Sequence, residues 1–167
     1  MRRPALVVWI LCVGCGGDMR HAAPEGRDAD VVRTRGAPSA AEWLAGAATA
    51  HAAADLAIDR GDRAGAQRTL VELLAVPVPR TLAAADREAV LADIYFRLAC
   101  VTVDQGVPAE SLAWAERGLD LGRSEDALTF NLLLARARAH EGLGRKADAS
   151  RDLAAAKRVH EALVTGR

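Results

Sequence analysis

The sequence predicts an all-α protein, and three observations carry that prediction. Aromatic residues make up only 4% of the chain while 51% of it is hydrophobic, and alanine is abundant. Alanine has the highest helix propensity, so this composition favours closely packed helices over β-sheet. No segment alternates apolar and polar residues with the period of two that a half-buried strand requires. Small residues also recur at fixed distances from three glycines, as described below.

Length and charge narrow the class of protein. A chain of 167 residues is long enough for one domain with a substantial core. Its 22 basic side chains balance 22 acidic ones, so no nucleic acid or other polyanion is expected as a partner. Three cysteines are too few for a disulfide framework.

The first fourteen residues have the composition of an export signal. Two arginines follow Met1, and Pro4 to Gly14 is an almost entirely apolar segment. A helix of that length covers roughly 16 Å, about half of the hydrocarbon core of a membrane. A charged start, a short apolar segment and a small residue before a cleavage point are typical of a secretory signal peptide, predicted here over residues 1–14.

The residues Cys12-Val13-Gly14-Cys15 resemble the lipobox of bacterial lipoproteins, although Cys12 stands where that family usually has leucine. The resemblance implies that Cys15 becomes the lipidated first residue, each buried CH₂ adding about 0.8 kcal/mol to membrane affinity. Gly16 follows in place of the aspartate that retains lipoproteins at the inner membrane, which implies an outer-membrane protein facing the periplasm. An ordinary cleaved signal is one alternative. A metal or redox pair is another, although zinc needs four ligands and no second cysteine pair exists.

Residues 15–38 are rich in Gly, Pro, Arg and Asp and have no apolar period. This segment predicts a flexible tether that reaches roughly 25 Å from the lipidated end. The helical domain is predicted over residues 39–167. It begins at Ser39 and Glu42, which have the spacing of a capping box.

Apolar periodicity, glycines and prolines predict six helices in this domain. On the first of them, one stripe at spacings of three and four is expected to face the core: Leu44, Ala47, His51, Ala54 and Ile58. Ser124 is the predicted N-cap of the fifth helix. The predicted helices cover residues 41–60, 64–75, 82–105, 108–121, 125–143 and 146–164.

A repeat emerges when Gly61, Gly106 and Gly144 are aligned, at intervals of 45 and 38 residues. Small residues lie seven positions before and five positions after each glycine. Small or apolar residues lie nine and twelve positions after it. The intervals suit helical-hairpin repeats, predicted at about 41–80, 82–123 and 124–164. The aligned sets are Ala54, Ala99 and Ala137; Ala66, Ser111 and Ala149; Leu70, Ala115 and Leu153; and Leu73, Gly118 and Ala156.

This pattern resembles tetratricopeptide (TPR) repeats, in which small residues lie where two helices touch and a glycine lies between them. The second repeat matches best. Arg136 stands where an apolar residue is usual, and Ala50 and Ala53 stand where larger ones are usual. The resemblance covers roughly residues 41–164 and implies a right-handed superhelical array of about three hairpins, a TPR-like α-solenoid. Some other helical bundle is the alternative.

In TPR proteins the first helix of each pair lines a concave groove that holds a peptide or a partner helix. Carried onto the matching positions, the resemblance implies a groove of mixed charge with one aromatic side chain. The alternative for each residue is an ordinary exposed or packing role. The groove candidates are His51, Asp55, Asp93, Phe96, Cys100, Asn131, Leu134 and Arg138.

No catalytic or cofactor motif is found, so neither enzyme activity nor a cofactor is predicted. His140-Glu141 and His160-Glu161 lack the second histidine of H-E-x-x-H and are expected on helix surfaces. Asp93 and Arg97, spaced i,i+4, are expected to pair on a solvated face. Cys100 lies in an apolar run and is expected to be an inert buried thiol.

These features together predict an envelope-anchored adaptor or scaffold for protein–protein interaction, with a protein or peptide partner and a membrane attachment through lipid. Anchoring would confine the partner to a surface and raise its effective concentration. The alternative is a small-molecule or glycan-binding accessory domain of an envelope enzyme or transporter. The scarcity of aromatic residues weighs against that alternative.

Overall fold

The computed structural model describes residues 38–122 and 126–166, which form six α-helices and contain no β-strand. The all-α prediction is therefore confirmed. The predicted signal peptide, Cys15 and all of the tether except Pro38 lie outside the described residues. None of the described helices combines the length and the hydropathy needed to cross a membrane. The helices are α1 (Ala40–Asp59), α2 (Arg63–Ala75), α3 (Ala84–Asp104), α4 (Pro108–Leu119), α5 (Ala127–Gly142) and α6 (Lys146–Thr165).

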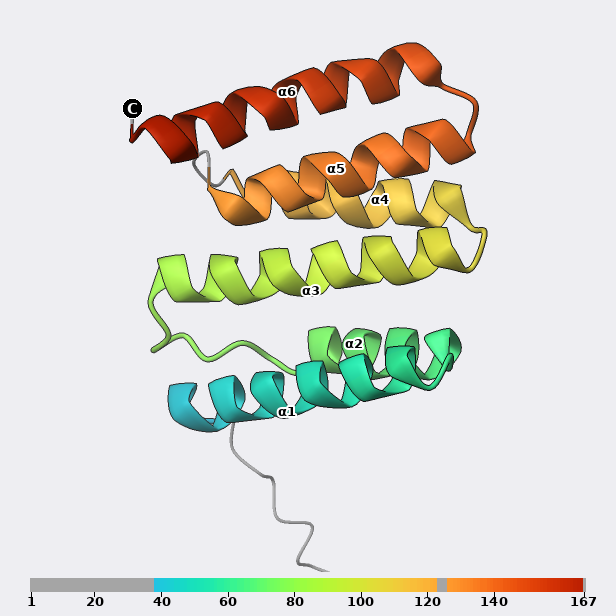
Figure 1. The fold of residues 1–167 in the computed structure, drawn as a ribbon. Helices are drawn as coiled ribbons and strands as arrows, with labels where there is room; N and C mark the ends of the chain where they lie inside the picture. Colours follow the sequence, from blue (N-terminus) through green and yellow to red (C-terminus); the bar gives the residue numbers. More distant parts are fainter. Residues whose placement is uncertain (1–37, 123–125, 167) are drawn as a thin grey trace, which may run out of the picture. The chain divides into compact units, whose positions relative to one another are not determined.

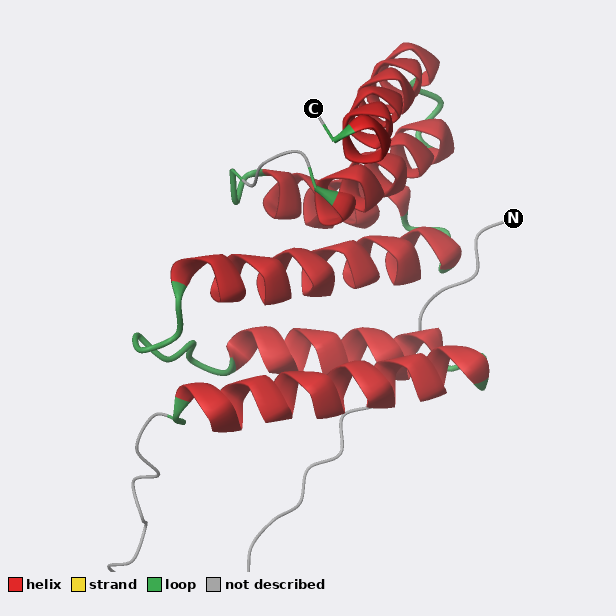
Figure 2. Ribbon diagram, turned by 60° about the vertical axis from the view of Figure 1, so that its left-hand side comes forward, coloured by secondary structure: helices red, strands yellow, loops and turns green. Residues whose placement is uncertain are grey.

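The six helices pack as three consecutive hairpins, α1 with α2, α3 with α4 and α5 with α6. Neighbouring hairpins meet through α2 and α3, through α4 and α5, and through α3 and α5. Figure 1 shows α1, α3 and α5 in the nearer layer, with the fainter α2 and α4 behind them. The hairpins follow one another in chain order in this view and in Figure 2. The right-handed superhelical sense implied by the TPR resemblance stays a prediction.

Capping side chains at the residue before each helix fix where α1 and α5 begin. The Ser39 hydroxyl accepts a hydrogen bond from the Glu42 amide at 3.2 Å, and the Glu42 carboxylate accepts one from the Ser39 amide at 2.9 Å. This is the reciprocal capping box that the sequence predicts. The predicted cap Ser124 lies outside the described residues. The structure gives that role to Asp126, whose carboxylate accepts from the Thr129 amide at 2.8 Å.

The three aligned glycines share one backbone conformation. Gly61, Gly106 and Gly144 have φ angles of +78°, +78° and +72°. Only glycine adopts this left-handed region without a steric penalty, so each residue ends the first helix of a hairpin and turns the chain into the second.

The small residues aligned on those glycines lie where the two helices of each hairpin meet. Ala54, Ala66 and Ala99 are completely buried, and Ala137 and Ala149 nearly so. The buried Ser111 hydroxyl donates to the Ala99 carbonyl at 2.7 Å, which joins α4 directly to the α3 backbone. Two helices approach this closely only where neither carries a large side chain.

Leu153 departs from its aligned partners, because it is 44% exposed while Leu70 and Ala115 are completely buried. Leu70 belongs to a cluster with Ile94 and Leu98 of the next hairpin. α6 is the last described helix, and no described hairpin covers Leu153 in the same way.

The predicted core stripe of α1 is wrong at both ends. Leu44 and Ile58 are 38% and 36% exposed, whereas Trp43 is buried at 2% exposed. α1 packs mainly against α2, so its buried side runs through Trp43, Ala47 and Ala54. Trp43 lies about 100° around the helix from Leu44, and the choice between them depends on where α2 lies.

Candidate interaction surface

Polar side chains of α1 and α3 form a connected network around Arg97. Its Nε lies 2.8 Å from Asp93 Oδ2, and its Nη1 lies 2.5 Å from Asp55 Oδ1. His51 Nδ1 lies 3.2 Å from the same oxygen of Asp93. The structure thus brings together three predicted groove residues, His51, Asp55 and Asp93. The expected Asp93–Arg97 pair is present, but Arg97 also links the first two hairpins, which the sequence did not indicate.

The environment of this network sets its charges. Burial lowers the pKa of His51 below its ordinary value, and the Asp93 carboxylate only partly offsets this, so the imidazole is uncharged at neutral pH. Its Nε2 atom is buried and has no hydrogen-bond partner among the described residues. Burial alone would lower the pKa of Arg97, but hydrogen bonds and charges from Asp93 and Asp55 raise it. The guanidinium therefore stays charged.

A second ion pair joins α3 to α5. Arg138 Nη2 lies 2.8 Å from Asp104 Oδ1, and both side chains remain substantially exposed. Cys100 lies within the electrostatic influence of this pair, but burial dominates and raises the pKa of its thiol. Cys100 therefore carries a protonated thiol at neutral pH and is a poor nucleophile.

The remaining groove candidates are mainly packing residues. Phe96 and Cys100 pack against a cluster of buried alanines from α3, α4 and α5. Leu134 packs against a cluster that includes Leu133 of its own helix and Val159 of α6. Asn131 is half-buried on α5. The candidate surface therefore consists of the residues that ion pairs or close polar contacts join across or along α1, α3 and α5, and we call it the first-helix row. Its members are His51, Asp55, Asp93, Arg97, Asp104 and Arg138.

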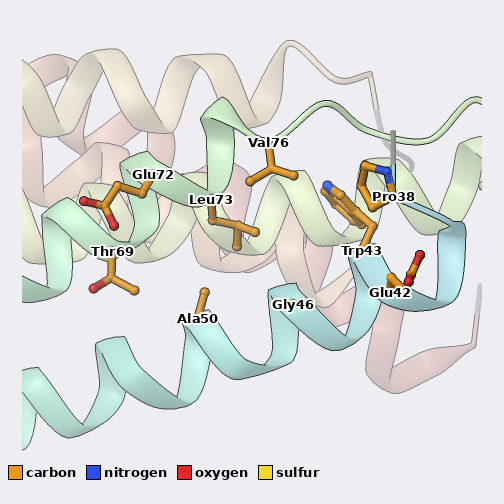
Figure 3. A pocket seen from close by; sticks show the side chains of 9 residues that line it. All are labelled: Pro38, Glu42, Trp43, Gly46, Ala50, Thr69, Glu72, Leu73 and Val76. Carbon is orange, nitrogen blue, oxygen red and sulfur yellow. The ribbon is translucent and has the colours of Figure 1, made fainter. Parts of the chain in front are cut away.

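An apolar cleft of ≈ 280 Å³ lies between α1 and α2, near the start of α1. Figure 3 shows the Trp43 ring between Pro38 and Val76. The indole Nε1 of Trp43 is buried and has no hydrogen-bond partner among the described residues. The sequence did not indicate this cleft, although the small residue Ala50 was a signal. The lining residues are Pro38, Glu42, Trp43, Gly46, Ala50, Thr69, Glu72, Leu73 and Val76.

A buried polar cluster in the third hairpin has a structural role. Arg136 donates two hydrogen bonds to the Asp152 carboxylate, at 2.8 and 2.6 Å, and His140 Nε2 lies 3.7 Å from it. His140 is only 12% exposed, so its predicted surface position is wrong, because α6 covers it. His160 is exposed as expected and lies beside Phe130. Arg136, at a position where the TPR family is apolar, thus has an acidic partner on α6.

Within residues 38–122 and 126–166, no three His, Cys, Asp or Glu side chains are placed to hold a metal ion. Comparison with known proteins gives no match to the chain, whether among protein-family models, curated proteins or solved structures.

Proposed function

We propose that this chain is a lipid-anchored adaptor of the bacterial cell envelope, whose helical hairpins hold a protein or peptide partner. In this proposal Cys15 attaches the chain to the outer membrane on its periplasmic side. Residues 16–38 form the tether, and the first-helix row contacts the partner. The observation that best supports it is that row, in which α1, α3 and α5 contribute charges of both signs.

The energetics of the row suit reversible binding. The side chains of Asp55 and Arg138 are 56% and 53% exposed. Ion pairs this exposed contribute only about 0–1 kcal/mol each. A partner that brings its own charges can therefore replace them at small cost, and positional confinement by the anchor raises its effective concentration.

The anchor is tested by Cys15→Ser, with Cys12→Ser as the matched control. Thioether formation requires the thiol of Cys15, so Cys15→Ser should move the protein from the membrane fraction to the soluble fraction. Cys12→Ser should stay in membranes. Fractionation of cells followed by immunoblotting measures both. A Cys15→Ser protein that remains membrane-bound at full length would show that the lipoprotein assignment is wrong.

The row is tested by placing a photo-crosslinking amino acid at Asp55, at Arg138 or, as a control, at Lys157 of α6, whose side chain is 76% exposed. The proposal expects the same protein to be captured in intact cells from both row positions and not from the control. Equal capture from all three positions, or capture from neither row position, would contradict it.

A further inference from the structure

The cleft between α1 and α2 exists because the first hairpin has small residues where the second has aromatic ones. With the closing glycines aligned, Ala50 corresponds to Tyr95 and Thr69 corresponds to Trp114. In the second hairpin these two rings stack, with centroids 6.1 Å apart and planes inclined by 22°. Ala50 and Thr69 instead line the cleft, so the corresponding space is open.

The two hairpins also carry opposite charges at one aligned position beside these residues. Arg117 of the second hairpin lies over the Trp114 ring, with its Cζ 4.6 Å from the ring centroid. The corresponding residue of the first hairpin is Glu72, which lines the cleft. The second hairpin therefore contains its own aromatic ring and cation, whereas the first has a space and a carboxylate.

Other groups around the cleft add to this complementarity. Glu72 has no ion pair among the described residues, and Glu42 provides a second carboxylate. Hydrogen bonds from Ser39 lower the pKa of Glu42, which keeps it charged at neutral pH. Trp43 adds a buried ring with an unpaired N–H, and a buried donor without a partner favours a ligand that brings an acceptor.

We propose that this cleft binds an aromatic side chain of a partner peptide that carries a lysine or arginine next to it. The ring enters beside Trp43 and Leu73, and the cation lies against Glu72. Such a ligand supplies from outside the aromatic–cation arrangement that the second hairpin makes for itself. The site goes beyond the proposed function, because it shares no residue with the first-helix row.

The test uses the full-length protein and three capped dipeptides. Acetyl-Trp-Lys-amide is the probe, with acetyl-Trp-Glu-amide and acetyl-Ala-Lys-amide as controls. The indole N–H resonance of Trp43, assigned with Trp43→Phe, is followed by NMR during each titration. We expect a saturable shift with Trp-Lys, about threefold or more weaker binding with Trp-Glu, and at least about tenfold weaker binding with Ala-Lys.

Two variants and one control variant keep the test independent of misfolding. Ala50→Tyr combined with Thr69→Trp recreates the ring pair of the second hairpin, and should abolish binding without lowering the melting temperature. Glu72→Gln should weaken Trp-Lys binding about threefold, while Glu116→Gln on exposed α4 surface should not change it.

Three outcomes would overturn the proposal. These are a Trp-Lys titration without a saturable shift, equal affinity for Trp-Lys and Trp-Glu, and unchanged binding to a folded variant whose cleft is filled. Crosslinking from Asp55 and Arg138 reports on the first-helix row alone, so failure of one proposal leaves the other standing.

Discussion

The second and third hairpins share one register but have opposite chemistry between their helices. At aligned positions, Leu98 corresponds to Arg136 and Trp114 corresponds to Asp152. Leu98 is completely buried in an apolar cluster against which Trp114 packs. Arg136 and Asp152 instead form a two-bond ion pair, in which the Asp152 side chain is only 8% exposed.

The next aligned pair continues this difference. Thr102 of α3 is completely buried, and its hydroxyl donates to the Leu98 carbonyl of its own helix at 2.7 Å. It therefore needs no partner from another helix. His140, at the same register on α5, has its Nε2 atom 3.7 Å from the Asp152 carboxylate of α6, beyond hydrogen-bond distance, and its buried Nδ1 atom has no hydrogen-bond partner among the described residues. The interior of the second hairpin is apolar apart from the Thr102 and Ser111 hydroxyls, whereas the third hairpin has an ion pair beside its apolar cluster.

What the two hairpins share is the set of small residues at the helix contact. Ala99 and Ala137 are both buried, as are Ser111 and Ala149 on the opposing helices. Two helices can therefore approach each other in the same way whether apolar or ion-paired side chains surround the small residues. The small residues set the architecture, and the side chains around them determine how strongly, and by which interactions, each hairpin is held.

Asp152→Ala tests the ion pair of the third hairpin and should have the largest effect on stability. It leaves the Arg136 guanidinium, whose side chain is 28% exposed, without its acceptor. Breaking such a pair by removing one partner should destabilise the protein by about 3 kcal/mol, measured by urea denaturation.

The matched control is the double variant Arg136→Leu with Asp152→Leu, which gives the third hairpin the apolar chemistry of the second. It should recover most of the lost stability, because apolar replacement of a buried ion pair is often neutral or stabilising. A single variant as stable as the wild type would show that the ion pair does not hold α6 to α5.

Ala99→Leu tests the feature that the hairpins share. Ala99 is completely buried against α4, where the Ser111 hydroxyl bonds to its carbonyl. A larger side chain must push the helices apart or adopt a strained rotamer, so we expect a loss of about 2 kcal/mol in the free energy of unfolding.

Ala113→Leu on the exposed side of α4 is the control for the change in residue type, and it should be nearly neutral. The proposed role of the small residues fails if the two variants have equal stability.

Features encoded by neighbouring residues could be predicted from the sequence. The capping box at Ser39 and Glu42, the start of α4 at Pro108 and the left-handed glycines each depend on a few consecutive residues. These local signals, with the helical period, were enough to place the six helices. The cap of α5 is an exception, because the sequence analysis predicted Ser124 and the structure has Asp126 in that role.

Features that depend on which helix covers which could not be predicted. Whether Trp43 or Leu44 is buried is decided by the position of α2, and His140 is buried because α6 lies over it. For the candidate surface, the predicted groove residues His51, Asp55 and Asp93 lie around Arg97, and their role in a groove stays a prediction. The repeat register did not indicate that Arg97 would join them or that Ala50 would leave a cleft, because both results require side chains from two helices.

A pH titration of His51→Gln extends the comparison to a smaller effect, because the contact between α1 and α3 contains charged side chains, as the third hairpin does. His51 faces Asp93 and Arg97 of α3 and Asp55 of its own helix. Its pKa is lowered on folding, mainly by burial, so the unfolded chain binds the proton more readily. The stability contributed above the ordinary histidine pKa of about 6.5 is therefore lost as the pH falls through the lowered value.

The expected result is that wild-type protein loses stability relative to His51→Gln between pH 8 and pH 5, measured by urea unfolding at several pH values. All other titrating groups are common to both proteins, so the difference isolates this imidazole. A difference that grows in favour of the wild type at low pH would mean that attraction to Asp93 outweighs burial. The histidine would then strengthen the junction when charged, as a cation beside a carboxylate, and the polar link between the hairpins would be ionic at low pH.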